Sequence, residues 1–261
     1  MDILTKIVTD KRVEVNLRKQ LIPIKQLERS VLFSRDTTSL SMRLRSSTTG
    51  IIAEHKRRSP SKQVINHNLN VFDVAKGYED AGVCGMSVLT NGKYFGGSLD
   101  DLLLARSNCS LPILRKEFII DEYQILEAKA FGADAILLIA AILSTKAIEQ
   151  FSLLAKQLHL DVLLEVHNAQ ELKESIMPSI DMLGVNNRNL KTFEVSLEIS
   201  KQLSEFIPND FVKVSESGIS NIQAIKALQA YGYQGFLIGE NFMKTDNAGK
   251  SAAQFINSLT K

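Results

Sequence analysis

The stretch DVLLEVHNAQELKES, from Asp161 to Ser175, has the pattern of one β-strand followed directly by one α-helix. Its short apolar run, Val162 to Val166, is typical of a buried strand. Asn168 follows, with Glu171 three residues later, and this spacing predicts a capped helix start. The stretch therefore predicts one βα unit, in which Glu165 lies near the carboxyl end of the strand.

Seven further apolar runs of similar length occur along the chain. The starts of successive runs are about 20 to 35 residues apart, which leaves room for one strand, one helix and two short loops in each unit. This alternation is typical of a parallel sheet. The eight predicted strands are Ile51–Ala53, Gly85–Leu89, Leu111–Leu114, Ala135–Ile139, Val162–Val166, Met182–Val185, Phe211–Val214 and Phe236–Ile238.

Helix start and stop signals lie between these runs. Several predicted helices begin at a polar residue that is followed three positions later by an acidic or amide residue, as capping boxes require or approximate. Others end at a glycine, where a left-handed conformation is favoured. The start residues are Ser98, Asp121 and Asn168, and the stop residues are Gly82, Gly132 and Gly232.

Eight βα units in about 210 residues predict an α/β fold of the closed (β/α)8 TIM barrel type. An open, doubly wound sheet is the alternative. That fold normally has a glycine-rich fingerprint after its first strand, where this chain has Arg57, Arg58 and Ser59. We therefore expect a single barrel domain over residues 1–261, with an N-terminal helical extension over residues 1–45 and the barrel over residues 46–261.

The N-terminal extension has a loose helical stripe of apolar residues that ends at Pro23. It is either a structural addition or a cover for one mouth of the barrel, where loops carry function. The sequence does not choose between the two. The stripe residues are Ile3, Ile7, Val8 and Leu17.

The composition is that of an ordinary soluble globular protein, with 44% hydrophobic and 23% charged residues. The net charge is only +2 and the charges are interspersed, so we expect no nucleic-acid or membrane partner. Charged residues interrupt the first apolar residues, which argues against a signal peptide. Cys84 and Cys109 are too few for a disulfide framework, and we therefore expect a reducing, cytoplasmic location.

Polar and charged residues end five of the predicted strands. In a TIM barrel the active site lies at the carboxyl ends of the strands, so these side chains meet at one rim. A single charged strand end is explained as well by a solvated loop. Five ends converging on one rim predict instead an acid/base site with two lysines among three carboxylates. The residues are Glu54, Lys56, Lys116, Glu165, Asn186 and Glu216.

Alternation along a strand decides which side chains point into the barrel. Glu54 and Lys56 share one face of the first strand, whereas His55 lies on the other face. Glu165 and His167 also share a face and have the spacing of metal ligands, but no further His or Cys cluster supports a metal site. We expect no metal here.

Glycine-containing loops follow the last two predicted strands: SESGI, Ser215–Ile219, and LIGE, Leu237–Glu240. TIM barrels frequently bind phosphate through backbone N–H groups of these two loops, and glycine allows close approach. Either segment alone also suits an ordinary turn. Together they predict a phosphate site, to which Glu240 would contribute its backbone N–H rather than its carboxylate.

Eight longer motifs are spread along nearly the whole chain. They are IIAEHKRRSPSK, SVLTNGKYFGGS, PILRKEFIIDEYQI, GADAILLIAAILS, LLEVH, GVNNRNLKTF, VSESGI and FLIGENFM. In their order and spacing, and in the helical segment before the barrel, they resemble the indole-3-glycerol phosphate synthase family of tryptophan biosynthesis.

The resemblance implies a carboxy-lyase that acts in aromatic amino acid biosynthesis. Its substrate would be 1-(2-carboxyphenylamino)-1-deoxyribulose 5-phosphate, and its products indole-3-glycerol phosphate, carbon dioxide and water. No metal or organic cofactor is implied. Ring closure is the attack of the arene carbon bearing the carboxylate on the ribulose carbonyl, which a cation at the developing alkoxide favours. Later loss of the hydroxyl requires an acid and a base.

The resemblance also implies roles for individual residues. Lys116 matches the family's cation at the developing alkoxide. The residues that match those sharing the later proton transfers are Lys56, Glu54 and Glu165. The other matches are Asn186 and Glu216 for orientation, Ser217, Gly218, Gly239 and Glu240 for the phosphate, Pro60, Phe95, Phe118 and Leu137 for the wall of the aromatic ring, and Ser59 and Arg188 for the carboxylate.

Three positions depart from the family pattern. Gln63 stands where the family usually has glycine, Ser196 stands where an aspartate is common, and His55 is unusual between its charged neighbours. None of the three removes a proposed catalytic group. Gln63 does put in doubt the flexibility of the loop after the first strand, which we expect to close over the substrate.

Two other interpretations stay open. The chain could be a related phosphate-binding barrel, such as a sugar-phosphate isomerase acting on the preceding pathway intermediate, which would need no pair of lysines. It could also be a partner subunit that binds a phosphate ligand without catalysis, although so many charges at one rim argue against this. As partners we expect a small phosphorylated substrate and a monomeric chain, with weak association with other pathway enzymes left open.

Overall fold

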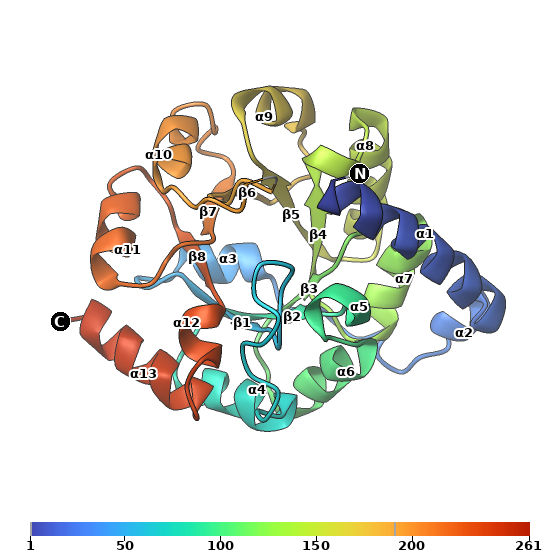
Figure 1. Ribbon diagram of the computed structural model, residues 1–261. Coiled ribbons are helices and arrows are strands. Elements are labelled where there is room, and N and C mark those ends of the chain that lie inside the picture. Colours follow the sequence, from blue (N-terminus) through green and yellow to red (C-terminus); the bar gives the residue numbers. More distant parts are fainter. Residues whose placement is uncertain (1, 191) are drawn as a thin grey trace.

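The computed structural model describes residues 2–190 and 192–261 and shows a closed barrel of eight parallel strands (Figure 1). Each strand pairs with its neighbours in chain order, and β1 pairs with β8 to close the barrel. The predicted TIM barrel is confirmed. The strands are β1 (Ile51–His55), β2 (Gly85–Leu89), β3 (Ile113–Lys116), β4 (Ala135–Ile139), β5 (Asp161–Val166), β6 (Met182–Asn186), β7 (Val212–Glu216) and β8 (Gly235–Ile238).

All eight predicted strands are present, and the largest difference is at β3. That strand was expected from Leu111 and begins at Ile113 instead. Pro112 directly precedes it and has no N–H to give to a ladder, so it suits the entry of a strand better than its interior. The shift places Lys116 as the last residue of β3.

Helices alternate with the strands and surround the barrel (Figure 1). The predicted helix starts are confirmed, because Ser98, Asp121 and Asn168 each accept a hydrogen bond from a backbone N–H in the first turn. The stop glycines all have left-handed φ angles, between 77° and 87°. The helices are α1 (Ile3–Leu21), α2 (Ile24–Leu27), α3 (Leu40–Arg45), α4 (Val71–Asp80), α5 (Gly92–Phe95), α6 (Leu99–Asn108), α7 (Glu122–Ala130), the 3-10 helix η1 (Ala140–Ile142), α8 (Thr145–Gln157), α9 (Ala169–Ser175), α10 (Glu198–Ser204), α11 (Ile222–Gln229), α12 (Glu240–Met243) and α13 (Ala248–Leu259).

Helix α3 closes the amino-terminal end of the barrel. Leu40 and Leu44 are fully buried and belong to the same apolar cluster as the side chains that fill the barrel interior. A Cβ atom on Gly85, the first residue of β2, would stand 2.5 Å from Leu40 Cδ1. With this end filled, the opposite end, at the carboxyl termini of the strands, is left for a pocket.

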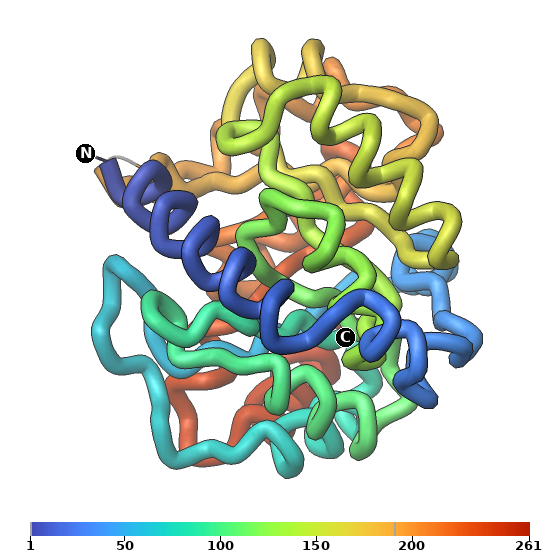
Figure 2. Tube along the Cα trace, turned by 90° about the vertical axis from the view of Figure 1, so that its right-hand side faces the viewer, coloured from blue at the N-terminus to red at the C-terminus, as the bar shows by residue number. Residues whose placement is uncertain are grey.

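The N-terminal extension runs along the outside of the barrel from one end to the other (Figure 2). The buried face of α1 consists of Ile7, Lys11 and Val15, which are spaced by four residues. The prediction that Leu17 belongs to this stripe is wrong, since Leu17 is 54% exposed on another side of the helix. No helix within the described ranges is long and apolar enough to cross a membrane.

Candidate active site

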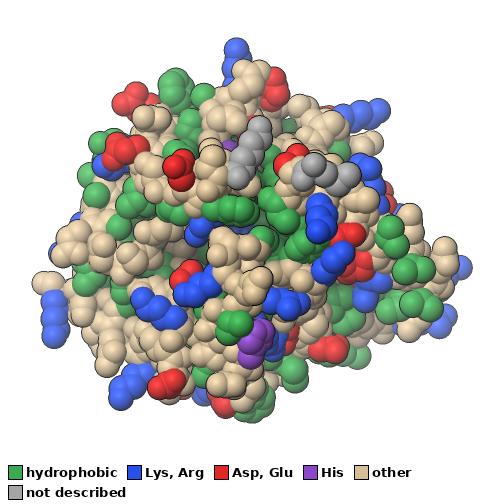
Figure 3. All heavy atoms as spheres, viewed as in Figure 1, with side chains coloured by type: hydrophobic (Ala, Val, Ile, Leu, Met, Phe, Trp, Pro, Cys, Tyr) green, Lys and Arg blue, Asp and Glu red, His purple; other side chains and the backbone are tan. Residues whose placement is uncertain are grey.

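A pocket of about 370 Å³ opens at the carboxyl ends of the strands. Every strand of the barrel contributes to its lining, and so does the start of α1. On this face Lys and Arg side chains are grouped around the barrel mouth (Figure 3). The pocket brings together all sixteen residues predicted as catalytic or substrate-binding: Glu54, Lys56, Ser59, Pro60, Phe95, Lys116, Phe118, Leu137, Glu165, Asn186, Arg188, Glu216, Ser217, Gly218, Gly239 and Glu240.

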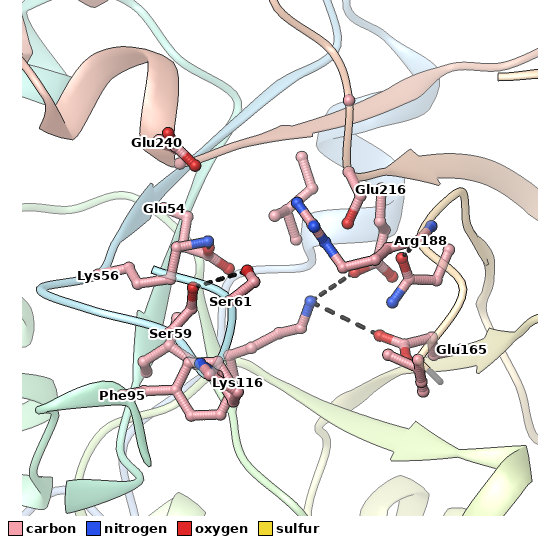
Figure 4. Close-up of a pocket in the computed structure, with 18 of the residues that line it drawn as sticks. Glu54, Lys56, Ser59, Ser61, Phe95, Lys116, Glu165, Arg188, Glu216 and Glu240 are labelled. Atoms are coloured by element: carbon pink, nitrogen blue, oxygen red, sulfur yellow. Dashed lines mark hydrogen bonds and ion pairs between the residues drawn. The ribbon is translucent and has the colours of Figure 1, made fainter. Parts of the chain in front are cut away.

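Lys116 extends from the end of β3 towards two carboxylates on other strands (Figure 4). Its Nζ lies 2.5 Å from Glu216 Oε2 on β7 and 3.7 Å from Glu165 Oε2 on β5. Burial alone would lower the pKa of Lys116, but the surrounding carboxylates, Glu216 first, outweigh burial and raise it. Lys116 therefore remains an ammonium ion at neutral pH, with 13% of its side chain exposed.

Glu54 and Lys56 form a second pair, with Glu54 Oε1 2.8 Å from Lys56 Nζ. Burial favours a raised pKa for Glu54, yet the charges of Lys56 and Lys116 outweigh it and hold the pKa below its usual value. A Cβ atom on Gly239 would stand 2.6 Å from Glu54 Oε1. Glycine at position 239 thus leaves room for this carboxylate, a role that the sequence did not reveal.

Of the three carboxylates Glu54, Glu165 and Glu216, the last holds a proton most readily. Burial raises its pKa to about 7, and repulsion from Glu165 adds to this, although Lys116 opposes it. Among the described residues, Oε1 of Glu216 has no hydrogen-bond partner. A Cβ atom on Gly184 of the neighbouring strand would stand 2.4 Å from that oxygen, so glycine there makes space for it.

Glu165 has a cationic neighbour on each side of its carboxylate. Oε2 faces Lys116, and Oε1 lies 3.3 Å from Nε2 of His167. Burial would raise the pKa of Glu165, but His167 and Lys116 outweigh burial and lower it to about 2. The metal-ligand spacing noted for Glu165 and His167 thus serves an ion pair. Within the described ranges no group of three His, Cys, Asp or Glu side chains is arranged to hold a metal ion.

The loops after β7 and β8 form the side of the pocket predicted to bind phosphate. Ser217 and Gly218 have left-handed φ angles of 68° and 78°, so the chain turns sharply directly after Glu216. The side chain of Glu240 is held 2.6 Å from Lys62 Nζ, in the loop after β1. This ion pair neutralises the carboxylate that would otherwise repel a dianion near the Glu240 backbone N–H.

An apolar wall occupies another side of the pocket. The rings of Phe95 and Phe118 lie 6.0 Å apart at an interplanar angle of 36°, and Pro60 and Leu137 also line the cavity. Several further wall residues were not predicted from the sequence. Three of them come from the first turns of α1, so this helix covers part of the barrel mouth. This agrees with the second of the two interpretations of the N-terminal extension, a cover for one mouth of the barrel. The missed apolar residues include Ile3, Leu4, Ile7, Leu89 and Ile139.

The two residues expected near the substrate carboxylate also lie in the pocket lining. Ser59 begins a tight turn that is closed by hydrogen bonds with the backbone of Lys62. Arg188 follows β6, and its backbone N–H donates to the side-chain oxygen of Asn186 at 3.0 Å. Asn186 is thus oriented from the same short segment that carries Arg188. The roles of these residues toward a substrate remain predictions.

The chain is similar to known proteins over nearly its whole length. The family model described as indole-3-glycerol phosphate synthase matches residues 4–255. An indole-3-glycerol phosphate synthase of Bacteroides thetaiotaomicron is 47% identical over 258 residues, which cover 99% of both chains. The chain belongs to the indole-3-glycerol phosphate synthase family. A second relative of that name, from Acinetobacter baylyi, is 43% identical over 93% of this chain and 91% of its own.

Solved structures outside the indole-3-glycerol phosphate synthase family share the fold at low sequence identity. A tryptophan synthase complex from Pyrococcus furiosus includes a chain with a TM-score of 0.62 and 13% identity, which covers 81% of this chain and 98% of its own. Thiamine phosphate pyrophosphorylase from Pyrococcus furiosus has a TM-score of 0.60 and 14% identity, with coverage of 85% and 98%. These likenesses show the barrel fold alone.

The departures from the indole-3-glycerol phosphate synthase pattern lie away from the described pocket lining. Gln63 is exposed on the loop after β1, and the backbone N–H of Ser196 donates to the carbonyl of Asn187. His55 is 1% exposed on the outer face of β1, as alternation predicted. Burial, with the nearby charge of Arg57, lowers its pKa to about 4, so it is neutral at physiological pH.

Proposed function

We propose that this protein is an indole-3-glycerol phosphate synthase, a lyase that closes an indole ring with loss of carbon dioxide and water. The substrate is 1-(2-carboxyphenylamino)-1-deoxyribulose 5-phosphate. One observation supports this reading most directly: the buried ammonium of Lys116 is held between Glu165 and Glu216 in a pocket with an aromatic wall. Family membership gives the same activity.

Ring closure is the step that Lys116 serves. When the arene carbon attacks the ribulose carbonyl, negative charge develops on the carbonyl oxygen. A preorganised cation in a pocket of low polarity stabilises such a charge far more than water does. The raised pKa of Lys116 keeps the cation in place before the substrate arrives. Loss of carbon dioxide then restores the aromatic ring.

Loss of the hydroxyl group needs one proton donor and one acceptor. We assign the acceptor role to Glu165, because its low pKa keeps it ionised throughout the physiological range. Lys56, paired with Glu54 at 2.8 Å, provides a second cation for the departing hydroxyl. Asn186 and Glu216 orient these groups and the sugar hydroxyls, for which Oε1 of Glu216, without a hydrogen-bond partner in the described part of the chain, is a suitable acceptor.

Substrate binding is divided between the two sides of the pocket. Phe95, Phe118, Pro60 and Leu137 contact the aromatic ring, and the backbone of Ser217, Gly218, Gly239 and Glu240 binds the phosphate. Ser59 and Arg188 bind the carboxylate that is later lost.

All of these residues belong to one chain, which supports a monomer as the working unit. We also infer a cytoplasmic location, supported by the unpaired, buried cysteines Cys84 and Cys109.

The test is an assay of the purified chain with two substrates. With the carboxyphenylamino substrate we expect the fluorescence of an indole product to rise. With the intermediate that precedes it in the pathway we expect no reaction. Conversion of the preceding intermediate alone would support a sugar-phosphate isomerase, and tight binding of the first compound without product would support a non-catalytic subunit.

A further inference from the structure

His167 lies directly after β5, two residues beyond Glu165, and its ring bridges two carboxylates. Nε2 is 3.3 Å from Glu165 Oε1, which is ion-pair distance without hydrogen-bond geometry, and Nδ1 is 3.1 Å from Glu171 Oε2, within hydrogen-bond distance. The ring is largely enclosed, with 14% of the side chain exposed. His167 is not among the described residues that line the pocket, so it reaches the site only through Glu165.

Glu171 is itself firmly held at the first turn of α9. Its Oε2 accepts a hydrogen bond from the backbone N–H of His167 at 2.8 Å, and its Oε1 accepts one from Nδ2 of Asn168 at 2.7 Å. The backbone N–H of Glu171 in turn donates to Oδ1 of Asn168. The helix start thus fixes the outer carboxylate, and that carboxylate fixes the imidazole ring.

We propose that His167 is a positioning residue of the active site, which holds the carboxylate of Glu165 in place and ionised and is itself held by Glu171. This role rests on the proposed function of Glu165 as proton acceptor. Each oxygen of Glu165 then has its own cation, His167 at Oε1 and Lys116 at Oε2. When Lys116 engages the substrate oxygen, His167 keeps its contact with Glu165, because its ring is anchored outside the pocket.

The charges around this array agree with such a role. Burial would lower the pKa of His167, but the carboxylates of Glu165 and Glu171 outweigh burial and raise it to about 10. The ring is therefore an imidazolium ion at neutral pH. The groups that face Glu165 from the neighbouring elements are Lys116 on β3, Asn186 on β6 and Glu216 on β7, with Glu54 and Lys56 on the β1 side of the same mouth.

The first test needs no substrate. The chain has four histidines, and NMR of labelled imidazole rings follows each of them from pH 5 to pH 11. We expect the resonance of His167, assigned by its loss in His167→Asn, to titrate near pH 10 and to move to lower pH in Glu165→Gln and in Glu171→Gln. A His167 pKa near 6.5 in the wild-type protein, unchanged in Glu165→Gln, would overturn the proposal.

The second test is kinetic. His167→Asn should lower kcat by up to about 100-fold, since a misplaced catalytic group costs that much, with KM changed by less than about twofold. Glu171→Gln should lower kcat less. The double variant should be no worse than His167→Asn alone, because Glu171 acts through the ring. The matched control is His159→Asn, an exposed residue with a left-handed φ of 58° that asparagine tolerates.

The outcomes separate this proposal from the proposed function. An unchanged kcat in His167→Asn, a loss confined to KM, or additive effects in the double variant would contradict a positioning role. If the wild-type protein formed no indole product, the proposed function would fail, and the NMR titration would still decide whether the ring is paired with Glu165. If His167→Asn did not fold, the resonance of His167 would be assigned through its own backbone signals, and the titrations of the wild-type protein and of Glu171→Gln would decide.

Discussion

Lys116 on β3 and Glu216 on β7 form an ion pair across the barrel mouth, with Nζ and Oε2 2.5 Å apart. Their strands are four positions apart in an eight-stranded barrel and so lie on opposite sides of it. The pair therefore spans the centre of the pocket, where a substrate must displace or share it. Both side chains are at least 87% shielded from solvent, which strengthens the interaction between their charges.

Glu216→Gln tests the protonation of this pair. Because the pKa of Glu216 is raised to about 7 from an ordinary value of 4.5, its contribution to stability is fully present below pH 4.5 and is lost as the pH rises through 7. Glutamine mimics the protonated form at every pH. We expect the free energy of unfolding of the wild-type protein, minus that of the variant, to fall between pH 5 and pH 8.

Denaturant unfolding at several pH values measures this difference in the free energy of unfolding. The contributions of titratable groups that both proteins share cancel when one free energy is subtracted from the other. The pKa values of Glu54 and Glu165 are lowered, so their contribution to the free energy of unfolding is lost as the pH falls. That loss occurs below the pH range of this experiment. A difference that does not change between pH 5 and pH 8 would show that Glu216 titrates elsewhere.

Gly184→Ala tests whether the glycine on β6 positions Glu216. The added Cβ atom would stand 2.4 Å from Glu216 Oε1 and 3.1 Å from Leu163 Cδ1, both at the ends of side chains that can shift. We expect a stability loss of about 1–3 kcal/mol, as for other overpacked sites, and a fall in kcat of about 10- to 100-fold as Glu216 moves away from Lys116. Steady-state kinetics and denaturant unfolding measure the two effects.

Gly92→Ala is the matched control, because a Cβ atom there would meet its nearest neighbour at an ordinary 3.5 Å. Its kcat should equal that of the wild-type protein. If Gly184→Ala also retained full activity, the contact between position 184 and Glu216 would have no part in catalysis.

Lys11→Met tests the attachment of the N-terminal extension. Lys11 is 2% exposed, and its Nζ lies 3.0 Å from Oε2 of Glu117, the residue next to Lys116. Removing Lys11 takes the ion-pair partner from the buried carboxylate of Glu117, which typically costs about 3–5 kcal/mol, although the charge of Arg115 still favours the carboxylate. We expect a loss of that size in the free energy of unfolding, measured with denaturant.

Lys93→Met removes a different ion pair between α1 and the barrel, the one with Asp10, which is exposed. It should leave the unfolding curve almost unchanged, since exposed pairs contribute little. Equal losses in the two variants would mean that burial of the Lys11 pair adds nothing to its effect.

The sequence predicted the barrel because the signal is local. Runs such as Ala135–Ile139 and Val162–Val166 are short, apolar and regularly spaced, and the helix starts between them carry their own capping residues. Alternation along β1 also placed Glu54 inward and His55 outward correctly, because side-chain direction in a strand depends only on position.

The features that the sequence did not reveal depend on contacts between distant segments. Lys11 is buried in α1 because Glu117, 106 residues away, pairs with it, and no helical pattern contains that information. The space that Gly184 gives to Glu216 depends on the register between β6 and β7. The same-face spacing of Glu165 and His167 was visible, but its use as an ion pair became clear only once Glu171 was seen on the other side of the ring.

The most direct measurement of the central claim is the rate of indole product formation by Lys116→Met with the carboxyphenylamino substrate. Methionine resembles the aliphatic part of the lysine side chain and carries no charge, so the developing alkoxide loses its cation. We predict a fall in kcat of about 10³-fold or more in a protein that still unfolds in one cooperative thermal transition, and full activity in the control Lys76→Met, on the exposed surface of α4. Wild-type turnover by Lys116→Met would contradict the account.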